Sequence, residues 1–345
     1  MTEKLRFRAA DLRPFVTAAL KAVEVVDGEA ELVAEVMVDA EERGYESQGL
    51  MRLPSYLRWA KAGEFRSPAA INVTRTKPSA IAVDGGNGWG AVVTARVMDM
   101  CIERARETGS CFAAVADVGH CGRLGYYVER AADQGMIGIL ALSGSLSAPV
   151  MAPWGGREAR LSTNPIAFGF PYPGGAPVVV DISTTQAARG KIAIANTKGE
   201  SIPEGWALDA EGNVTTDPKQ ALPPAGTMAP LGGHKGFALA VAVELMSAAI
   251  AGEYPREGDG MFVAAFDIGG VTEPDLYARA VAALDSSVRS SAPREGYPAP
   301  ALPGTGSAER KARAQSDGVE VAPEIWRQVT DAVAGLGLDP PQPSR

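Results

Sequence analysis

The 345-residue sequence predicts an α/β protein of the α+β type, with a mainly helical part and a sheet-rich part. Apolar residues repeat at helical spacing near both chain ends. Short apolar runs separated by glycine and proline fill the middle and are typical of strands. We therefore expect residues 1–70 and 236–345 to form a helical domain and residues 71–235 a sheet-rich domain.

The first third of the chain predicts helices followed by a hairpin. Residues 10–63 are predicted to be helical, with Asp27 as the cap of one helix and Gly44 just past its end. Residues 71–76 and 80–83 flank a short turn and form a predicted β-hairpin. The next predicted elements are a helix over 92–106, a strand over 111–116, a helix over 124–134 and a strand over 136–142.

Strands continue in the middle of the chain, and helices return near its end. The apolar runs 165–171 and 177–182 are bounded by proline and glycine, which predicts two strands. Residues 198–218 are rich in turn formers and are expected to be irregular. The remaining predictions are helices over 237–251, 273–291 and 323–335, a strand over 261–266 and an extended loop over 292–310.

Charge and cysteine content exclude several classes of partner. The formal net charge of −8 argues against nucleic acid or an anionic membrane as the main partner. The longest apolar stretch, residues 237–251, contains Glu244 and is too short to cross a bilayer. The N-terminus lacks the apolar run of a signal peptide, and three cysteines without a CxxC motif suit a reducing compartment. We predict a cytoplasmic protein with neither a membrane nor a nucleic-acid partner.

Two histidines, His120 and His234, are the only ones in the sequence, and both lie in glycine-rich turns. In such turns the backbone can approach a ligand closely, and imidazole suits proton transfer near neutral pH. The residues alone leave two interpretations open, a built site or two histidines that merely cap turns. The histidines are far apart in sequence and no cysteines cluster, so we predict no metal site.

One motif suggests a Rossmann fold. Residues 84–91 contain G-x-G-x-x-A between a predicted strand and a predicted helix, which is the weak form of the Rossmann phosphate turn. The next acidic residue after a strand, Asp117, comes about thirty residues later instead of the usual twenty or so. The strand before the motif also belongs to a hairpin, so we predict that the fold is not Rossmann.

A set of motifs in fixed order is the most specific signal. The motifs are Arg43-Gly-Tyr-Glu-Ser-Gln-Gly49, Met51-Arg-Leu-Pro-Ser-Tyr56, Gly119-His-Cys-Gly-Arg-Leu-Gly-Tyr-Tyr127, Ala152-Pro-Trp-Gly-Gly156, Ser162-Thr-Asn-Pro165, Val180-Asp-Ile-Ser-Thr184, Ala188-Arg-Gly-Lys191, Ile202-Pro-Glu-Gly-Trp206, Thr215-Thr-Asp-Pro218, Leu231-Gly-Gly-His-Lys-Gly236 and Pro303-Gly304. Together they resemble the malate/L-lactate dehydrogenase family that lacks a Rossmann fold. That family includes ureidoglycolate dehydrogenase, sulfolactate dehydrogenase and piperideine-2-carboxylate reductase. The resemblance covers about residues 5–335.

The resemblance implies an oxidoreductase that moves a hydride between NAD or NADP and C2 of a small 2-oxo or 2-hydroxy acid. It implies that residues 71–235 bind the dinucleotide on a mixed, largely antiparallel sheet. The helices of the two chain ends are expected to pack together as the other domain. It also implies a homodimer with its sites near the subunit interface, and a small carboxylate as the partner molecule.

A carboxylate substrate requires a cationic side chain, and arginine binds it best through two parallel charge-assisted hydrogen bonds. By resemblance, Arg52 is the substrate arginine, and Arg189 with the adjacent Gly190 is a second candidate. A solvated helix arginine is the competing interpretation for Arg52. Thr163 and Asn164 match positions where the family brings polar groups to the substrate, although an asparagine before proline also forms turns.

Ketone reduction also requires a proton donor. His120 aligns with the acid/base histidine of ureidoglycolate dehydrogenase-like members and is the predicted acid/base. The Ser-His-Gly motif of many members is here Ser47-Gln48-Gly49, and glutamine cannot supply a proton at ordinary pH. Ser47 is expected to orient Gln48 or the substrate. Lys191 lies near a position where some members have a relay residue.

Gln48 leaves two alternatives open. A cyclic imine such as piperideine- or pyrroline-2-carboxylate can arrive already protonated, so that hydride delivery alone completes its reduction. Such a cyclic imino acid reductase would need no acid at position 48. The other alternative is a catalytically impaired homologue that binds the nucleotide and has lost turnover together with the histidine.

The cofactor carries phosphates, which favour backbone N–H groups, helix starts and basic residues. The resemblance implies dinucleotide contacts at His120, Cys121, Gly122, Arg123, Leu124, Asp181, Ile182, Ser183, His234 and Lys235. Arg310, followed by Lys311, is expected to meet a ribose phosphate. The segment Thr305-Gly-Ser-Ala departs from the usual Pro-Gly-Glu-Arg pattern of the family, so the choice between NAD and NADP stays open.

Overall fold

The computed structural model describes residues 4–144, 149–252 and 259–344. The helices are α1 (Ala9–Lys21), α2 (Asp27–Glu42), α3 (Leu53–Ala62), α4 (Gly90–Thr108), α5 (Gly125–Asp133), α6 (Arg189–Lys198), α7 (His234–Glu244), α8 (Pro274–Arg289), α9 (Thr305–Asp317) and α10 (Pro323–Val333). The strands are β1 (Leu5–Phe7), β2 (Asn72–Lys77), β3 (Ala80–Gly88), β4 (Ser110–Val118), β5 (Met136–Ser143), β6 (Ile166–Phe170), β7 (Val178–Ile182), β8 (Ala207–Asp209), β9 (Val214–Thr215), β10 (Gly226–Met228), β11 (Asp259–Asp267) and β12 (Val319–Val321). Short 3-10 turns are η1 (Glu46–Gln48), η2 (Leu50–Arg52), η3 (Pro218–Gln220) and η5 (Ile268–Gly270), and the π-helical segment η4 (Leu245–Ala249) continues α7.

The main sheet confirms the predicted mixed, largely antiparallel arrangement. Within the described residues it has seven strands in the order β2-β3-β4-β11-β5-β6-β7. Only β3 and β4 are parallel, because α4 crosses over between them, and every other neighbouring pair is antiparallel. The predicted hairpin is present as β2 and β3, with Val73 opposite Val83. A Rossmann fold needs consecutive parallel strands, and β4 has an antiparallel neighbour on its other side.

The strand β11 lies at the centre of this sheet, although it comes from the C-terminal segment predicted to be mainly helical. It pairs with β4 on one side and β5 on the other, with Val263 opposite both Ala113 and Leu140. Its run of buried apolar residues suits a strand with neighbours on both sides. The segment 236–345 therefore also contributes to the sheet, and the proposed division into domains is not tested by this observation.

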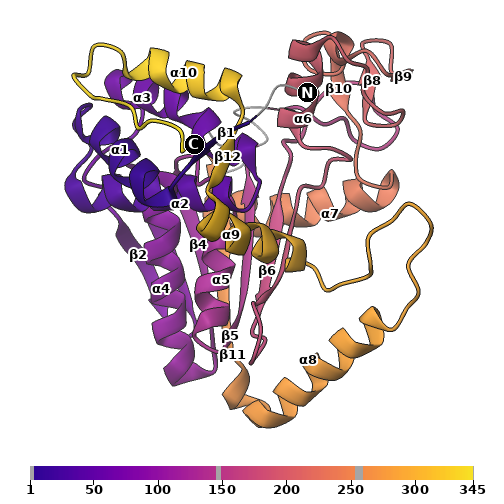
Figure 1. The fold of residues 1–345 in the computed structure, drawn as a ribbon. Coiled ribbons are helices and arrows are strands. Elements are labelled where there is room, and N and C mark those ends of the chain that lie inside the picture. Colours follow the sequence, from indigo (N-terminus) through magenta and orange to yellow (C-terminus); the bar gives the residue numbers. More distant parts are fainter. Residues whose placement is uncertain (1–3, 145–148, 253–258, 345) are drawn as a thin grey trace.

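Helices cover both faces of the sheet (Figure 1). Successive side chains of a strand point to opposite faces. Accordingly, Met261 and Val263 of β11 belong to the large core that includes α4, whereas Phe262 packs with Val243 of α7. α4 and α5 cover one face, and α7 with η4 covers part of the other.

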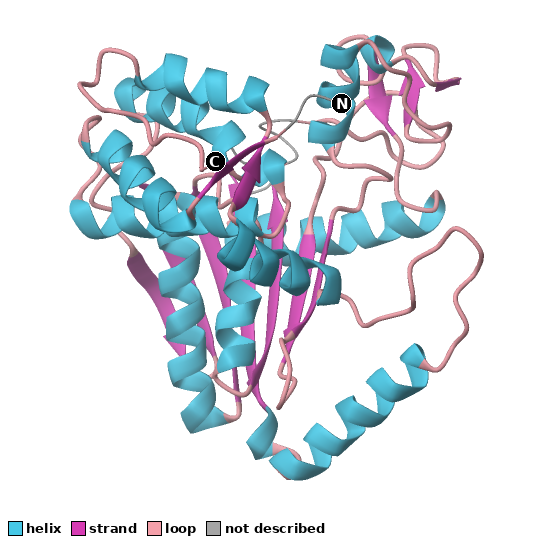
Figure 2. Ribbon diagram, in the orientation of Figure 1, coloured by secondary structure: helices cyan, strands magenta, loops and turns pink. Residues whose placement is uncertain are grey.

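The two chain ends meet in a helical layer at one end of the sheet (Figure 2). α1 packs on α2, and α10 packs on α3. The short strands β1 and β12 pair antiparallel, with Leu5 opposite Val321, and the rings of Phe7 and Trp326 are 4.3 Å apart. The expected packing of N-terminal and C-terminal helices is therefore present, and one apolar core continues from this layer into the sheet.

Several elements differ from the prediction. Asp27 is the first helical residue of α2 and not its cap, and its carboxylate makes no cap hydrogen bond. α9 begins at residue 305, inside the span predicted as an extended loop, because Gly304 in a left-handed conformation ends that loop. α9 has few apolar residues, so no helical periodicity marks it. The span 198–218 contains β8 and β9, which join β10 in a small sheet.

A buried cluster of charged residues joins the helical layer to the sheet. Asp39 of α2 accepts hydrogen bonds from Arg43 at 3.0 Å, Arg123 at 2.9 Å and Lys311 at 2.7 Å. Glu129 of α5 accepts from Arg43 at 2.9 Å and from Arg123 at 2.8 Å. Three cations and two anions, drawn from α2, α5, α9 and the segment before α5, thus hold these elements together. In the described part of the chain, no helix is both long enough and apolar enough to cross a membrane.

Candidate active site

The turn formed by η1 and η2 carries three of the predicted site residues, Ser47, Gln48 and Arg52. The Nε group of Arg52 donates a hydrogen bond of 2.8 Å to the backbone carbonyl of Ser47. Gly190 at the start of α6 packs on the other side of Ser47, where an added Cβ would lie only 2.7 Å from Cβ of Ser47. The structure therefore brings the start of α6, with Arg189 and Gly190, against the turn that holds Arg52.

His120 lies beside this turn. Tyr56 follows Arg52 by four residues, so both lie on the same face of the helical segment η2–α3. The hydroxyl of Tyr56 is 2.8 Å from Nδ1 of His120, and the backbone N–H of Gly122 donates to the same nitrogen at 3.3 Å. Two tautomers of the neutral ring fit these contacts: with the proton on Nε2, Nδ1 accepts from Gly122, and with the proton on Nδ1, the ring donates to the Tyr56 hydroxyl. The second tautomer leaves a lone pair on Nε2, which can then accept a proton from a ligand.

The electrostatics of this cluster favour an anionic ligand. Burial lowers the pKa of His120 to about 3, and the positive charge of Arg52 adds to that effect. Burial also lowers the pKa of Arg52, as does the nearby charge of Arg189, whereas Tyr56 raises it. The site at neutral pH thus contains a neutral imidazole and two guanidinium groups close enough to repel each other. A carboxylate placed between the guanidiniums would relieve this repulsion.

The segment 181–190 connects this cluster to a second group of predicted residues. At its start, the carboxylate of Asp181 accepts the backbone N–H of Gly125 at 2.8 Å, one turn beyond the His120 loop. In its middle, the N–H of Thr184 donates to the carbonyl of Thr163 at 2.9 Å. Its end is Arg189 and Gly190. The segment thus runs from the His120 loop past Thr163 to the Arg52 turn.

The same segment anchors the turn before α7. The carbonyl of Thr184 accepts the N–H of Leu231 at 2.8 Å, and the side chain of Gln186 accepts the N–H of Gly232 at 2.9 Å. His234 and Lys235 follow, and both are solvent-exposed at the helix start. Ile182 is also exposed, on the edge strand β7. The predicted residues Ile182, Ser183, His234 and Lys235 therefore border one accessible region.

Other predicted residues have partners within the protein. Asn164 is buried and donates to the carbonyl of Ala240 at 3.1 Å and to Glu244 at 2.8 Å. Arg123 lies in the buried charge cluster, with Cys121 and Leu124 buried beside it. The ammonium group of Lys191 is 6.0 Å from the centroid of the Trp206 ring. Arg310 donates to the carbonyl of Arg43 at 2.7 Å, and Lys311 pairs with Asp39.

Three residues of this region were not singled out by the sequence: Tyr56, Gln186 and Glu41. Tyr56 stands one helical turn after Arg52, and that spacing was the available signal. Gln186 contacts Gly232, 46 residues further along the chain, so no local pattern marks it. Glu41 is buried below the Arg52 turn, and in the sequence nothing distinguishes it from the other acidic residues of the same helix.

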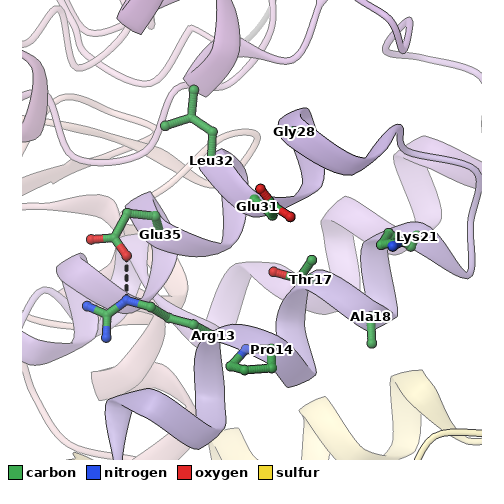
Figure 3. Close-up of a pocket in the computed structure, with 9 residues that line it drawn as sticks. All are labelled: Arg13, Pro14, Thr17, Ala18, Lys21, Gly28, Glu31, Leu32 and Glu35. Carbon is green, nitrogen blue, oxygen red and sulfur yellow. Dashed lines mark hydrogen bonds and ion pairs between the residues drawn. The ribbon is translucent and has the colours of Figure 1, made fainter.

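A cavity of about 900 Å³ lies elsewhere, between α1 and α2 (Figure 3). An Arg13–Glu35 ion pair spans it, and its other lining residues include Thr17, Lys21 and Glu31. None of the predicted site residues lines it. It has no imidazole and no pair of guanidiniums, so it lacks the groups for the chemistry of the His120 cluster. Across the described ranges, no group of three or more histidine, cysteine or acidic side chains is arranged to hold a metal ion.

The fold and the His120 cluster define a class of protein. A neutral imidazole near Arg52, with Arg189 near the same guanidinium, is equipped for acid–base chemistry on a small carboxylate, and a mixed sheet without Rossmann topology carries it. Residues 7–330 match the malate/L-lactate dehydrogenase family, and the chain belongs to that family.

Individual relatives agree with the family assignment. The chain is 42% identical over 254 residues, 74% of each chain, to (2R)-3-sulfolactate dehydrogenase (NADP(+)) of Chromohalobacter salexigens. It is similar to the solved sulfolactate dehydrogenase of Methanocaldococcus jannaschii, with 32% identity, a TM-score of 0.88 and coverage of 97% and 98% of the two chains. A δ1-piperideine-2-carboxylate reductase from Pseudomonas syringae pvar. tomato shares 25% identity at a TM-score of 0.82, covering 95% and 99%.

The protonation state of His120 can be measured directly because the chain has only two histidines. With His234→Asn removing the other ring, we expect nitrogen NMR to show a neutral imidazole throughout the range from pH 8 to about pH 4. The additional change Arg52→Gln removes the nearby positive charge and should raise the pKa of His120. A midpoint near the ordinary value of 6.5 in the parent would contradict this electrostatic description.

Proposed function

We propose that the protein interconverts a small 2-hydroxy acid and its 2-oxo acid, with NAD or NADP as hydride acceptor or donor. Its family consists of malate/L-lactate dehydrogenases, and relatives are named sulfolactate, malate and lactate dehydrogenases. The single observation that carries the proposal is the placement of the His120 imidazole near Arg52, whose guanidinium in turn lies near that of Arg189. Dehydrogenation at C2 requires this combination of a proton acceptor and a carboxylate clamp.

Arg52 binds the carboxylate next to the reacting carbon. Its Nε is occupied by the carbonyl of Ser47, which orients the guanidinium and leaves its terminal nitrogens for the ligand. Gly190 allows α6 to approach, so that Arg189 adds a second positive charge. Two cations suit a substrate with two acidic groups, such as malate or sulfolactate, better than one with a single carboxylate.

His120 transfers the proton. As a neutral base in the tautomer whose Nδ1–H donates to the Tyr56 hydroxyl, its bare Nε2 accepts the hydroxyl proton of the substrate while C2 is oxidised, and the imidazolium returns that proton in the reverse direction. The low pKa of His120 favours the neutral form before substrate binds. A bound carboxylate offsets the charge of Arg52, so the imidazolium becomes more accessible when the substrate is in place. Tyr56 supports Nδ1 and, because burial raises its pKa, stays protonated.

The accessible region beside the cluster fits a dinucleotide. Gly232 and Gly233 have positive φ angles of 58° and 68°, and a Cβ on Gly232 would meet no atom within 4 Å. α7 starts next to them with Lys235 in its first turn and no acidic residue there, which suits a phosphate. Ile182, Ser183, His234 and Lys235, with the backbone of Gly122, would hold the cofactor. When bound, the nicotinamide supplies or accepts the hydride.

Buried predicted residues act differently in this proposal. Arg123, Leu124 and Cys121 have side chains inside the protein, so the 121–124 segment would meet the cofactor through its backbone. Arg310 and Lys311 are held by α2 and the residues after it, which makes Arg310 the least supported of the proposed cofactor contacts. Asn164 and Lys191 would act through the elements they hold in place.

A substrate panel tests the proposal. With NAD and NADP supplied separately, malate and sulfolactate should be oxidised with a higher kcat/KM than lactate. His120→Gln should lower kcat by about 10²- to 10⁴-fold, because it removes a general acid/base, while nucleotide affinity measured by fluorescence titration changes little. Retention of turnover within a few-fold in His120→Gln would refute the assignment. A parent protein that binds NADPH yet turns over none of the acids or imines would be a nucleotide-binding homologue.

A cyclic imino acid reductase is the second candidate. Gln48 stands where many relatives have histidine, and among the described residues its buried Oε1 has no hydrogen-bond partner. A carbonyl oxygen in this position is an acceptor that suits the N–H of a cyclic iminium. The similarity to a δ1-piperideine-2-carboxylate reductase also supports this candidate, whereas the names of the other relatives favour hydroxy acids.

The two candidates predict opposite effects of Gln48→His. If the substrate is a hydroxy acid, the variant should gain activity with 2-oxo acids or keep it. If the substrate is a cyclic imine, the parent should reduce piperideine-2-carboxylate, and the variant should lose at least part of that activity because it lacks the acceptor. Parent enzyme that reduces pyruvate-like acids well and leaves both cyclic imines untouched would rule out the second candidate.

A homodimer is proposed from the exposed apolar surface. The outward face of α7 and η4 is apolar at Val241 and at Leu245, whose side chain is 58% exposed. On the sheet face beside α7, Phe112 is 43% exposed. α8 extends away from the rest of the fold in Figure 1, with Leu284 57% exposed. Exposed apolar side chains on a sheet face and on two helices are typical of an interface, and a second copy of the chain is the proposed partner.

The dimer can be disrupted at α7. Leu245→Glu places a charge on the apolar face and should convert a dimer to a monomer in sedimentation analysis, since a buried unpaired charge is unfavourable. Val73→Glu on the exposed edge strand β2 is the matched control and should leave the dimer intact. A parent protein that sediments as a monomer would contradict the proposed dimer.

The location and domain division are also proposals. A cytoplasmic location is supported by three free cysteines, Cys101, Cys111 and Cys121, all buried. A division into residues 1–70 with 236–345, and residues 71–235, is supported by the helical layer at the chain ends. In this division, β11 belongs by sequence to the first part and pairs with strands of the second.

A further inference from the structure

Glu41 is a buried acidic residue in the last turn of α2, directly below the turn that carries Arg52. Glu41 is only 4% exposed. Oε2 of its carboxyl group accepts the backbone N–H of Leu50 at 2.9 Å, and Leu50 itself is fully buried. A side chain of α2 thus contacts the first residue of η2. The 3-10 turns η1 and η2 together form the turn that carries Ser47, Gln48 and Arg52.

Gly49 is the residue that permits this contact. A Cβ at position 49 would lie 1.8 Å from Oε2 of Glu41 and 2.9 Å from its Cδ. The requirement for glycine includes space, because the carboxyl group of Glu41 occupies the position that a side chain at residue 49 would take. The carboxyl group of Glu41 is therefore fitted into the turn at the point between Gln48 and Leu50.

We propose that Glu41 is a positioning residue for the reaction, whose carboxyl group holds the turn that carries Ser47, Gln48 and Arg52. Arg52 is fixed to this turn by its bond to the carbonyl of Ser47, and Ser47 is the contact surface for Gly190. Displacement of Leu50 would thus move the carboxylate clamp and its contact with α6 together. The inference rests on the proposed function, because it assigns Glu41 to the substrate clamp of that same site.

The protonation of Glu41 follows from its two oxygens. Oε2 accepts a hydrogen bond, whereas the buried Oε1 has no partner among the residues described. Oε1 is therefore the oxygen that would carry the proton of the neutral acid. Burial raises the pKa of Glu41 to about 8; the Leu50 N–H opposes this shift, the charge of Glu46 adds to it, and Lys4 opposes it.

Charged groups surround Glu41 on every side of its cavity, which has a volume of about 360 Å³. Lys4 and Glu46 form an ion pair of 2.7 Å at its rim, and they are the charged residues that act most on Glu41. The remaining charged residues that line the cavity are Arg6 and Glu320 near β1 and β12, Glu42 on α2, and Arg310, Arg313 and Asp317 on α9. None of Ser47, Gln48, Arg52 and His120 lines this cavity, so it borders Glu41 apart from the substrate site.

The expected pH dependence has a definite sign. The folded-state pKa of Glu41 is raised above its ordinary value of 4.5, so the folded protein favours the neutral acid. The ordered turn is fully favoured at low pH and is progressively lost as the pH rises through about 8. Above that pH the new carboxylate must be hydrated, which displaces the turn and weakens substrate binding by Arg52.

Three variants of the chain separate positioning from simple structural support. Glu41→Gln keeps an acceptor oxygen for Leu50 and cannot ionise, so it should retain activity within a few-fold and lose the alkaline decrease of kcat/KM. Glu41→Ala removes the acceptor and should raise KM for the acid substrate by about 10- to 100-fold, with a smaller effect on kcat. Gly49→Ala should resemble Glu41→Ala, because the added Cβ displaces the carboxyl group that Glu41→Ala removes.

Two substitutions at the cavity rim should shift the alkaline limb, the decrease of kcat/KM at high pH, in opposite directions along the pH axis. Glu46→Gln removes a negative charge that raises the pKa of Glu41, so the limb should shift to lower pH. Lys4→Gln removes a positive charge that lowers it, so the limb should shift to higher pH. In Glu41→Gln neither rim substitution should have any effect on the pH profile.

A readout independent of turnover keeps this inference separable from the proposed function. Hydrogen exchange of the Leu50 amide should accelerate above about pH 8 in the parent and should stay slow in Glu41→Gln. An unchanged alkaline limb in Glu41→Gln, or a Leu50 amide whose exchange has only its ordinary dependence on hydroxide, would overturn the role of Glu41. A parent with the predicted Leu50 exchange and no turnover of any acid would overturn the proposed function alone.

Discussion

The ion pair between Asp39 and Arg123 is the interaction on which the candidate site depends. Arg123 follows His120 by three residues, and Asp39 lies in α2, so the pair joins the His120 loop to the helical layer. Although burial alone would raise the pKa of Asp39, Arg123, Arg43 and Lys311 lower it to about 2. Removing one partner from such a buried cluster leaves an unpaired charge, which typically destabilises a protein by about 3–5 kcal/mol. The loop is therefore held in one place relative to α2.

α2 positions both halves of the site. Asp39 fixes the loop that carries His120, and Glu41, two residues further along, supports the turn that carries Arg52. One helix thus contacts both the loop with His120, the proposed proton-transfer group, and the turn with Arg52, the proposed carboxylate clamp. Glycines make both contacts possible by leaving room for the charged groups. A Cβ on Gly125 would lie 2.1 Å from the guanidinium of Arg123, just as one on Gly49 would meet Glu41.

Local patterns were sufficient to predict most elements of the sheet. The β2–β3 hairpin, β4, β5 and the pair β6–β7 match predicted runs because their apolar residues are continuous or alternate. α9 could not be predicted because its sequence is polar, and contacts such as that of Lys311 with Asp39 hold it. The central position of β11 was equally hidden, since a strand's neighbours depend on chain segments more than a hundred residues away.

The sequence alone determined the inventory of the site: one imidazole in a glycine turn, an arginine after the Ser47 motif and the family to which these belong. The tertiary structure decided how each group behaves. Arg52 lies near the imidazole and Arg189 lies near Arg52, whereas Arg123 and Arg310 are engaged by the helical layer, and no local feature distinguishes the four. The protonation of His120 was also decided there, because burial and the charge of Arg52 act through space between segments that only folding brings together.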